Sequence, residues 1–294
     1  MFLFRSTAGL TSLFDQVFCV VTMLRDSQYL NATFRLSELE HHYGPKIHIL
    51  SDPFLFSLLA RFSDPDCKQP MVNQLLNRLY SELVKCVVNA EFEACETSLQ
   101  TRMAAMHPEG KYVASIVDPS SRVVTVALAR AGTVPSHICF DALNHILDPE
   151  GVRQDHISIN RKTDSAEKVI GTNLGGVKIG GDIEGAYVFF PDPMGATGST
   201  LKTAMEIYRD EVKGKAKKFI ALHLIVTPEY LSMVTRECPD LIVYALRLDR
   251  GLSPQDVLDT VPGSRWKEER GLNPKHYIVP GAGGVGELIN NSYV

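Results

Sequence analysis

Metal-binding patterns are missing from the cysteines and histidines of this chain of 294 residues. Its six cysteines are scattered, none belongs to a C-x-x-C pair, and none has a histidine at the spacing of zinc ligands. The nine histidines include no H-E-x-x-H arrangement. We therefore expect reduced thiols, a cytoplasmic location and no zinc ion held by protein ligands.

Long apolar runs and concentrated positive charge are also absent. No run approaches the roughly 18–20 apolar residues of a membrane-spanning helix, so we expect no membrane contact. The formal net charge is −4, and no basic arm carries interleaved aromatic residues, which argues against nucleic-acid binding. The apolar stretch 13–24 is interrupted by Asp15 and Gln16, so we expect an ordered extension helix there rather than a targeting peptide.

What the chain does have is an alternation of apolar and amphipathic segments. We assign residues 1–45 to an N-terminal extension and 46–294 to the main domain. Helical spacing predicts helices at 52–62 and 71–88, and an alternating α/β pattern begins near Arg122. The predicted strands are 123–129, 157–160, 186–190, 218–226 and 241–246, and the predicted helices are 136–147, 199–210 and 228–237. This alternation predicts an α/β fold with a mostly parallel central sheet flanked by helices.

The segment 186–200, AYVFFPDPMGATGST, is the most informative part of the chain. A buried strand ends in Asp192, and a loop of small residues then leads into an amphipathic helix. Backbone N–H groups at such a helix start bind phosphate, and hydroxyls of Thr197, Ser199 and Thr200 can donate further hydrogen bonds. The Asp192 carboxylate can accept hydrogen bonds from sugar hydroxyls. The pattern predicts a site for a phosphorylated sugar; the alternative is an ordinary turn capped by Ser199.

Two arginines follow predicted strands that would lie near this one. Arg130 comes after 123–129 and Arg161 after 157–160. Ligands of parallel α/β sheets gather beyond the carboxyl ends of the strands, so we expect both arginines to converge with Asp192. An arginine fork binds a diphosphate through paired hydrogen bonds and keeps its charge. The alternative for either arginine is a surface salt bridge.

The residues D-P-M-G-A-T-G-S-T at 192–200 resemble the PRPP-binding motif of type I phosphoribosyltransferases, where PRPP is 5-phosphoribosyl 1-diphosphate. The form is closest to the uracil phosphoribosyltransferase branch, D-P-M-x-A-T-G-x-[ST]. Residues 129–132 (ARAG) are similar to that family's L-R-A-G, and Arg161 matches an arginine at a strand end. The resemblance implies that PRPP contacts Asp192, Pro193, Met194, Gly195, Ala196, Thr197, Gly198, Ser199 and Thr200.

Residues 276–287, HYIVPGAGGVGE, resemble the family's C-terminal signature Y-I-x-P-G-L-G-D-A-G-D. The resemblance implies a C-terminal base-binding loop, or hood, in which main-chain groups read the edge of uracil. The uracil-contacting residues would be Tyr277, Ile278, Gly283, Gly284 and Val285. The chain departs from the signature at Gly284 and Glu287, which stand where the family has aspartates. An insertion at about 253–271 contains Trp266 and is a lid, a partner surface or decoration.

The resemblance as a whole implies conversion of uracil and PRPP to UMP and diphosphate. Asp192, Arg130 and Arg161 would be the catalytic residues, Mg²⁺ would arrive with PRPP, and GTP is a candidate allosteric activator. The family also implies a homodimer or a higher homo-oligomer. Two alternatives stay open because of Gly284 and the altered terminal loop. One is a catalytically degenerate paralogue that binds PRPP or a nucleotide for regulation, and the other is a phosphoribosyltransferase for another base.

Overall fold

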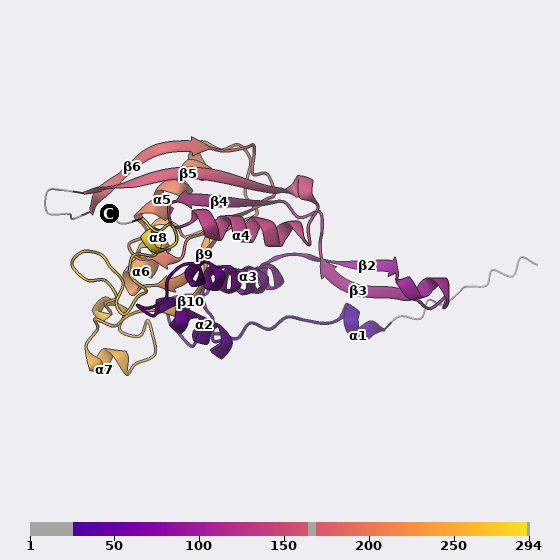
Figure 1. Cartoon of the computed structure of the whole chain (residues 1–294), viewed down its shortest axis with the longest axis horizontal. Helices are drawn as coiled ribbons and strands as arrows, with labels where there is room; N and C mark the ends of the chain where they lie inside the picture. The colour runs from indigo at the N-terminus through magenta and orange to yellow at the C-terminus, as the bar shows by residue number, and fades with distance from the viewer. Residues whose placement is uncertain (1–25, 164–168, 293–294) are drawn as a thin grey trace, which may run out of the picture. The chain divides into compact units, whose positions relative to one another are not determined.

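A computed structural model describes residues 26–163 and 169–292 of the chain, and Figure 1 shows its helices and strands. Its contacts divide the chain into two units. One unit comprises residues 1–32 and 96–115, and the other comprises 33–95 and 116–294. The helix expected within residues 13–24 lies outside the described residues.

The described residues of the first unit form a short helix, parts of two strands and a 3₁₀ turn. Helix α1, Ser27–Leu30, begins at Asp26, whose side chain accepts a hydrogen bond from the Gln28 N–H group. Strands β2 (Ala94–Gln100) and β3 (Lys111–Val117) pair as a two-stranded sheet. The first two residues of β2 and the last two of β3 belong to the second unit. A 3₁₀ turn, Arg102–Ala105, lies between the two strands. No strand was predicted from the sequence in this region.

The second unit is built on an eight-stranded sheet in the order β1-β10-β9-β7-β4-β5-β6, with β8 paired to β9. The strands are β1 Ile47–Ile49, β4 Val123–Ala129, β5 Val152–Thr163, β6 Val169–Lys178, β7 Tyr187–Pro191, β8 Met194–Gly195, β9 Lys218–Val226 and β10 Leu241–Leu248. All the described pairs are parallel except β5 with β6, which form an antiparallel hairpin. The mostly parallel α/β sheet predicted from the sequence is therefore confirmed.

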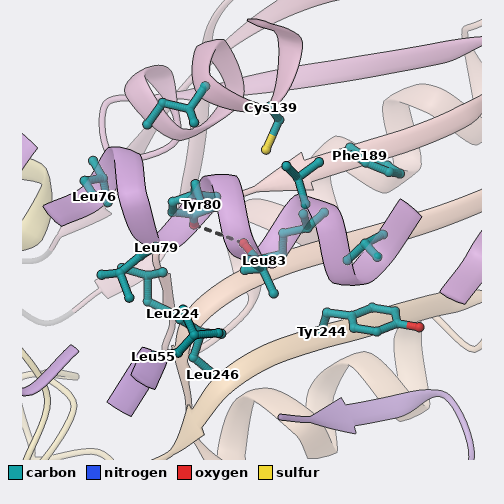
Figure 2. Packing of buried hydrophobic residues seen from close by; sticks show 14 of the residues in the cluster. Leu55, Leu76, Leu79, Tyr80, Leu83, Cys139, Phe189, Leu224, Tyr244 and Leu246 are labelled. Atoms are coloured by element: carbon teal, nitrogen blue, oxygen red, sulfur yellow. Dashed lines mark hydrogen bonds between the residues drawn. The ribbon is translucent and has the colours of Figure 1, made fainter. Parts of the chain in front are cut away.

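Helices cover both faces of this sheet, as a parallel sheet requires. One core contains buried residues of α2 (Pro53–Ser63), α3 (Met71–Glu91) and α4 (Thr133–Asn144). The other contains those of α5 (Ser199–Asp210) and α6 (Pro228–Glu237). Figure 2 shows α3 in the first core, where Leu76, Leu79 and Leu83 pack near strand residues and the Tyr80 hydroxyl donates to the Leu222 carbonyl at 3.1 Å. This burial fixes α3 on the sheet.

The order of the strands changes direction between β4 and β7. From β4 the chain passes to β5 on one side of it, and later returns to β7 on the other side. The connections therefore diverge between the carboxyl ends of β4 and β7, and open α/β sheets bind ligands at such a point. Arg130 follows β4 and Asp192 follows β7, so both flank this point.

The bounds of four elements agree with the prediction: β4, β9, α5 and α6. Helix α4 begins at Thr133 rather than at residue 136, because Pro135 fits the first turn of a helix, where its missing N–H group costs nothing. Strand β5 is longer than the predicted 157–160, since it continues to Thr163 by pairing with β6. Arg161 therefore lies inside a strand and not at its end, which corrects the prediction.

Strand β6 lies between the predicted strands 157–160 and 186–190 and was not predicted. The glycines and polar residues of this strand do not form a recognisable strand pattern. Its extended conformation depends on pairing with β5. Among the described helices, none is both long enough and apolar enough to cross a membrane.

Candidate functional site

The phosphate loop, residues 192–200, connects the buried strand β7 to helix α5. All five residues of β7 are buried, and β8 then pairs with β9 at Met194 and Gly195. The Asp192 carboxylate accepts the Met194 N–H group at 3.1 Å, so this side chain shapes the turn that follows the strand. The loop is thus attached to the sheet before it enters the helix.

Helix α5 begins without a side-chain cap. Its N-cap is Gly198, in the left-handed region with φ +80°, and no side chain bonds to the first turn. The first intrahelical bond runs from the Lys202 N–H group to the Gly198 carbonyl at 2.9 Å. The N–H groups of the preceding residues therefore remain directed out of the helix end, where the helix dipole adds positive potential. The alternative of a turn capped by Ser199 does not describe this helix start.

The carbonyl groups of the same loop are held on its far side by Thr227. The Thr227 hydroxyl donates to the Ala196 carbonyl at 2.8 Å, and the Thr227 N–H group donates to the Gly195 carbonyl at 3.1 Å. Thr227 is fully buried and is the N-cap of α6. Carbonyl oxygens repel an anion, so holding them away from the helix start leaves that side to the N–H donors.

The buried rings of His223 and Tyr230 support the phosphate loop through hydrogen bonds. His223 contacts the Asp192 carbonyl through Nδ1 at 2.5 Å and the Tyr230 hydroxyl through Nε2 at 2.6 Å. Because a carbonyl only accepts, Nδ1 carries the proton and Nε2 accepts from Tyr230. Burial lowers the pKa of His223 to about 4, so the ring is neutral near pH 7. These bonds fix the backbone at Asp192 without placing a charge beneath it.

Close packing of the loop against β9 and α6 requires glycine at positions 195 and 198. A Cβ atom at Gly195 would lie 2.9 Å from Val226 Cγ1 and 3.2 Å from the Tyr230 ring. One at Gly198 would lie 1.9 Å from Met233 Cε, at a backbone angle that L side chains rarely adopt. Glycine therefore allows the loop to lie directly on α6.

Arg130 follows β4 near the end of β7, and it forms the surface salt bridge that was the alternative interpretation. A Cβ atom at Gly132 would lie 2.8 Å from the Pro191 carbonyl, so the segments that follow β4 and β7 are in close contact. The Arg130 guanidinium donates from Nη2 to Glu287 at 2.9 Å and from Nη1 to the Ser292 hydroxyl at 3.0 Å. The peptide bond between Ala129 and Arg130 is cis. Arg130 thus joins the sheet edge to the C-terminal turn.

Arg161 is not brought to the same edge position. Ala129, the last residue of β4, pairs with Ser158, so Arg161 lies three positions further along β5, opposite Thr172. Its side chain lies outside the described part of the structure. Its contact with diphosphate remains a prediction.

The predicted base-binding residues lie in two different environments. The side chains of Ile278 and Val285 are buried, which leaves main-chain groups to face a ligand, whereas Tyr277 is exposed. Tyr277, Gly283 and Gly284 line a cavity of about 440 Å³. Its other wall is the α2–α3 turn, residues 62–67, which sequence reasoning did not assign to any site.

An ion pair holds the start of the C-terminal loop. Arg247 binds Asp249 in a bidentate manner at 2.6 and 2.8 Å, and the Asp249 carboxylate accepts the Gly281 N–H group at 2.7 Å. Asp249 is only 2% exposed, so this charge is available to the loop rather than to solvent. The pair is a positioning device that the sequence analysis missed.

The insertion at 253–271 is anchored by a second buried ion pair. Arg250 binds Glu269 at 3.0 Å and also donates to the carbonyls of Val257, Leu258 and Thr260. Glu269 is 1% exposed and is the partner of the Tyr43 hydroxyl, whose pKa is raised by burial and by this contact. The pair ties both the insertion and Tyr43 to the sheet.

Trp266 of the insertion reaches α6, which carries the phosphate loop's support. Its indole N–H donates to the Pro228 carbonyl at 2.9 Å, and its ring meets Tyr43 edge to face. A surface cavity of about 630 Å³ lies near the loop and is lined by Thr197, Glu229, residues 272–274 and His276.

Sequence reasoning could have found some of the missed residues. Thr227 begins a T-P-E-Y segment, which has the form of a helix N-cap followed by proline. His223 is the one polar residue in the otherwise apolar run 219–226, and nothing in such a pattern distinguishes a hydrogen-bonded support from any other core residue.

Comparisons with known proteins agree with this geometry. A family model described as uracil phosphoribosyltransferase matches residues 49–264. The chain is 28% identical over 244 residues to a uracil phosphoribosyltransferase of Thermosipho africanus, covering 83% of this chain and 98% of that one. A uracil phosphoribosyltransferase of Variovorax paradoxus is 26% identical over 245 residues, covering 83% and 97%.

A solved structure, AQ2163 protein from Aquifex aeolicus, has the same fold with a TM-score of 0.63 and 20% identity, covering 84% of this chain and 99% of that one. The fold and the family match define a phosphoribosyltransferase, an enzyme that transfers a pentosyl group. The chain belongs to the uracil phosphoribosyltransferase family.

Proposed function

We propose that this protein converts uracil and PRPP to UMP and diphosphate. The observation that carries the proposal is the uncapped start of α5, preceded by Asp192 and placed beside Arg130 where the strand connections diverge. A 5′-phosphate needs N–H donors, and a diphosphate needs a permanent cation. Both kinds of group follow the ends of the neighbouring strands β4 and β7.

The phosphate loop, residues 192–200, binds the 5′-phosphate of PRPP. The N–H groups at the start of α5 and the hydroxyls of Thr197, Ser199 and Thr200 donate to the phosphate oxygens. This contact lies away from the bond that breaks, so its binding energy serves to position C1 of the ribose. Asp192 accepts hydrogen bonds from the ribose hydroxyls.

The reaction itself needs no covalent intermediate with the protein. N1 of uracil forms a bond to C1 of the ribose, the bond from C1 to the diphosphate oxygen breaks, and the N1 proton is lost. Arg130 and Arg161 bind the departing diphosphate, whose negative charge grows as it leaves. Main-chain groups at Tyr277, Ile278, Gly283, Gly284 and Val285 hold uracil in line with C1.

Mg²⁺ enters this scheme as part of the PRPP substrate. Mg²⁺ usually keeps several waters and binds substrate phosphates with one or two carboxylates, and the Asp192 carboxylate at the loop fits that ligand chemistry. GTP as an activator and a homodimer or higher homo-oligomer are further proposals for this chain that the family suggests.

The test is product formation from radiolabelled uracil, PRPP and Mg²⁺, with and without GTP, beside a panel of other bases. UMP from uracil in preference to the other bases supports the proposal. A nucleotide formed from another base in place of UMP would contradict the uracil assignment. PRPP binding by calorimetry without any turnover would instead indicate a regulatory protein.

A further inference from the structure

The Glu287 carboxylate occupies the space beside Gly284. A Cβ atom at Gly284 would lie 2.6 Å from Glu287 Oε2 and 3.5 Å from Glu287 Cδ. No side chain fits at position 284 while Glu287 keeps this conformation. The space that a residue-284 side chain would enter is filled by a carboxylate from three residues later.

The same carboxylate binds the arginine at the sheet edge. Glu287 Oε1 accepts from Arg130 Nη2 at 2.9 Å, while the Ser292 hydroxyl accepts from Arg130 Nη1 at 3.0 Å. The Ser292 N–H group in turn donates to the Glu287 carbonyl at 3.1 Å. One short turn therefore holds both terminal nitrogens of Arg130.

We infer that Glu287, which carries the only carboxylate at the two positions where the family has aspartates, positions Arg130 for the diphosphate of PRPP. The lack of a side chain at Gly284 leaves the space that this carboxylate occupies. The inference rests on the proposed function for the identity of the anion. Glu287 is a positioning residue, since it acts through Arg130.

Stability alone does not account for the pair. The Arg130 and Glu287 side chains are 50% and 42% exposed, and exposed pairs of this kind contribute about 1 kcal/mol or less. An ordered guanidinium, however, keeps donors for a second anion, because its five N–H groups exceed the two acceptors present. The pair therefore affects where Arg130 lies more than whether the chain folds.

The inference is tested by exchanging the source of the carboxylate. Glu287→Ala is expected to raise the KM for PRPP about tenfold to a hundredfold, the range for a misplaced binding group, with little change in the KM for uracil. Gly284→Asp alone is expected to lower kcat/KM, because two carboxylates compete for one space. The double variant Gly284→Asp with Glu287→Ala restores one carboxylate and is expected to recover most of the PRPP affinity.

Glu268→Gln is the matched control, because Glu268 forms an exposed ion pair with Arg265 away from this site, and we expect its KM values to be unchanged. Unaltered PRPP affinity in Glu287→Ala, tighter affinity in it, or additive losses in the double variant would overturn the inference. Titration of each variant with inorganic diphosphate by calorimetry gives a second measurement. If the wild-type protein makes no UMP, the proposed function fails, while the diphosphate affinities still decide the role of Glu287.

Discussion

The phosphate loop and the C-terminal segment, residues 247–287, face the same edge of the sheet but are held by different forces. Behind the phosphate loop lie neutral hydrogen bonds from Thr227, His223 and Tyr230. The C-terminal segment is held by ion pairs, two of them with a buried carboxylate, at Asp249 and Glu269. The loop for which we propose phosphate binding is thus supported without charge, whereas the loop for which we propose base binding is held by ion pairs.

This difference has a physical reason. A charged group beneath the phosphate loop would alter the potential at the helix start, and a buried neutral ring does not. A neutral base is less sensitive to nearby charge, so ion pairs can fix the shape of its loop. The two regions should therefore respond differently to the loss of a single charge.

The largest expected effect is on stability in the C-terminal segment. Glu269→Gln removes the buried carboxylate that pairs with the largely covered Arg250, and breaking a buried pair costs about 3–5 kcal/mol. Urea denaturation of the variant should show that loss in the free energy of unfolding. The adjacent Glu268→Gln removes an exposed pair and should cost about 1 kcal/mol or less. Equal losses at the two positions would show that burial of the pair does not matter.

The next effect is on turnover at the phosphate loop. Asp192→Asn keeps an acceptor for the Met194 N–H group but loses the charge that we propose faces the ribose. We expect kcat/KM to fall about 10²–10³-fold, as for other lost groups that act in the transition state, with an unchanged melting temperature. Steady-state kinetics with an unchanged rate would remove Asp192 from the site.

A smaller effect concerns pH. The folded pKa of His223, about 4, lies below the usual value of 6.5, so the unfolded chain binds the proton more readily. Stability from this group is complete above pH 6.5 and is lost as the pH falls toward 4, by about 3 kcal/mol for a shift of this size. His223→Gln can make both hydrogen bonds without titrating, so its unfolding free energy should depend less on pH between 6.5 and 5. Identical pH profiles of the two proteins would contradict the neutral support.

The smallest expected effect tests the fit of the phosphate loop on α6. Gly198→Ala places a side chain at φ +80°, which costs about 1–2 kcal/mol and displaces the start of α5. The KM for PRPP should rise about tenfold, which is the effect of a loss of about 1.4 kcal/mol. Gly176→Ala in β6 meets no atom within 4 Å and serves as the control. If both variants have the wild-type KM, the loop does not depend on its glycine.

The sequence predicts the parts of this fold in which one segment determines its own structure. Strand β9 and helices α5 and α6 have the predicted bounds because their apolar spacing is clear, and Thr227 and Pro228 also mark the start of α6. Strand β6 was not predicted, since its pairing depends on β5. The β2–β3 sheet was also not predicted, since β2 is polar and both strands depend on pairing with one another.

The candidate site divides in the same way. The motif at 192–200 is continuous in the sequence, and its loop could be recognised from the residues alone. The supports of the site could not, because Thr227, His223 and Arg247 meet the loops only after folding. The relation between Gly284 and Glu287 was likewise hidden, since only the spatial contact shows that the Glu287 carboxylate fills the space beside Gly284.

The most direct test of the account is a titration of the amide resonances of residues 197–201 with PRPP and Mg²⁺, followed by NMR. If the start of α5 binds the 5′-phosphate, these N–H resonances should shift strongly downfield, and ribose 5-phosphate should shift the same set. PRPP that binds without moving them would contradict the central claim that this helix start is the phosphate site.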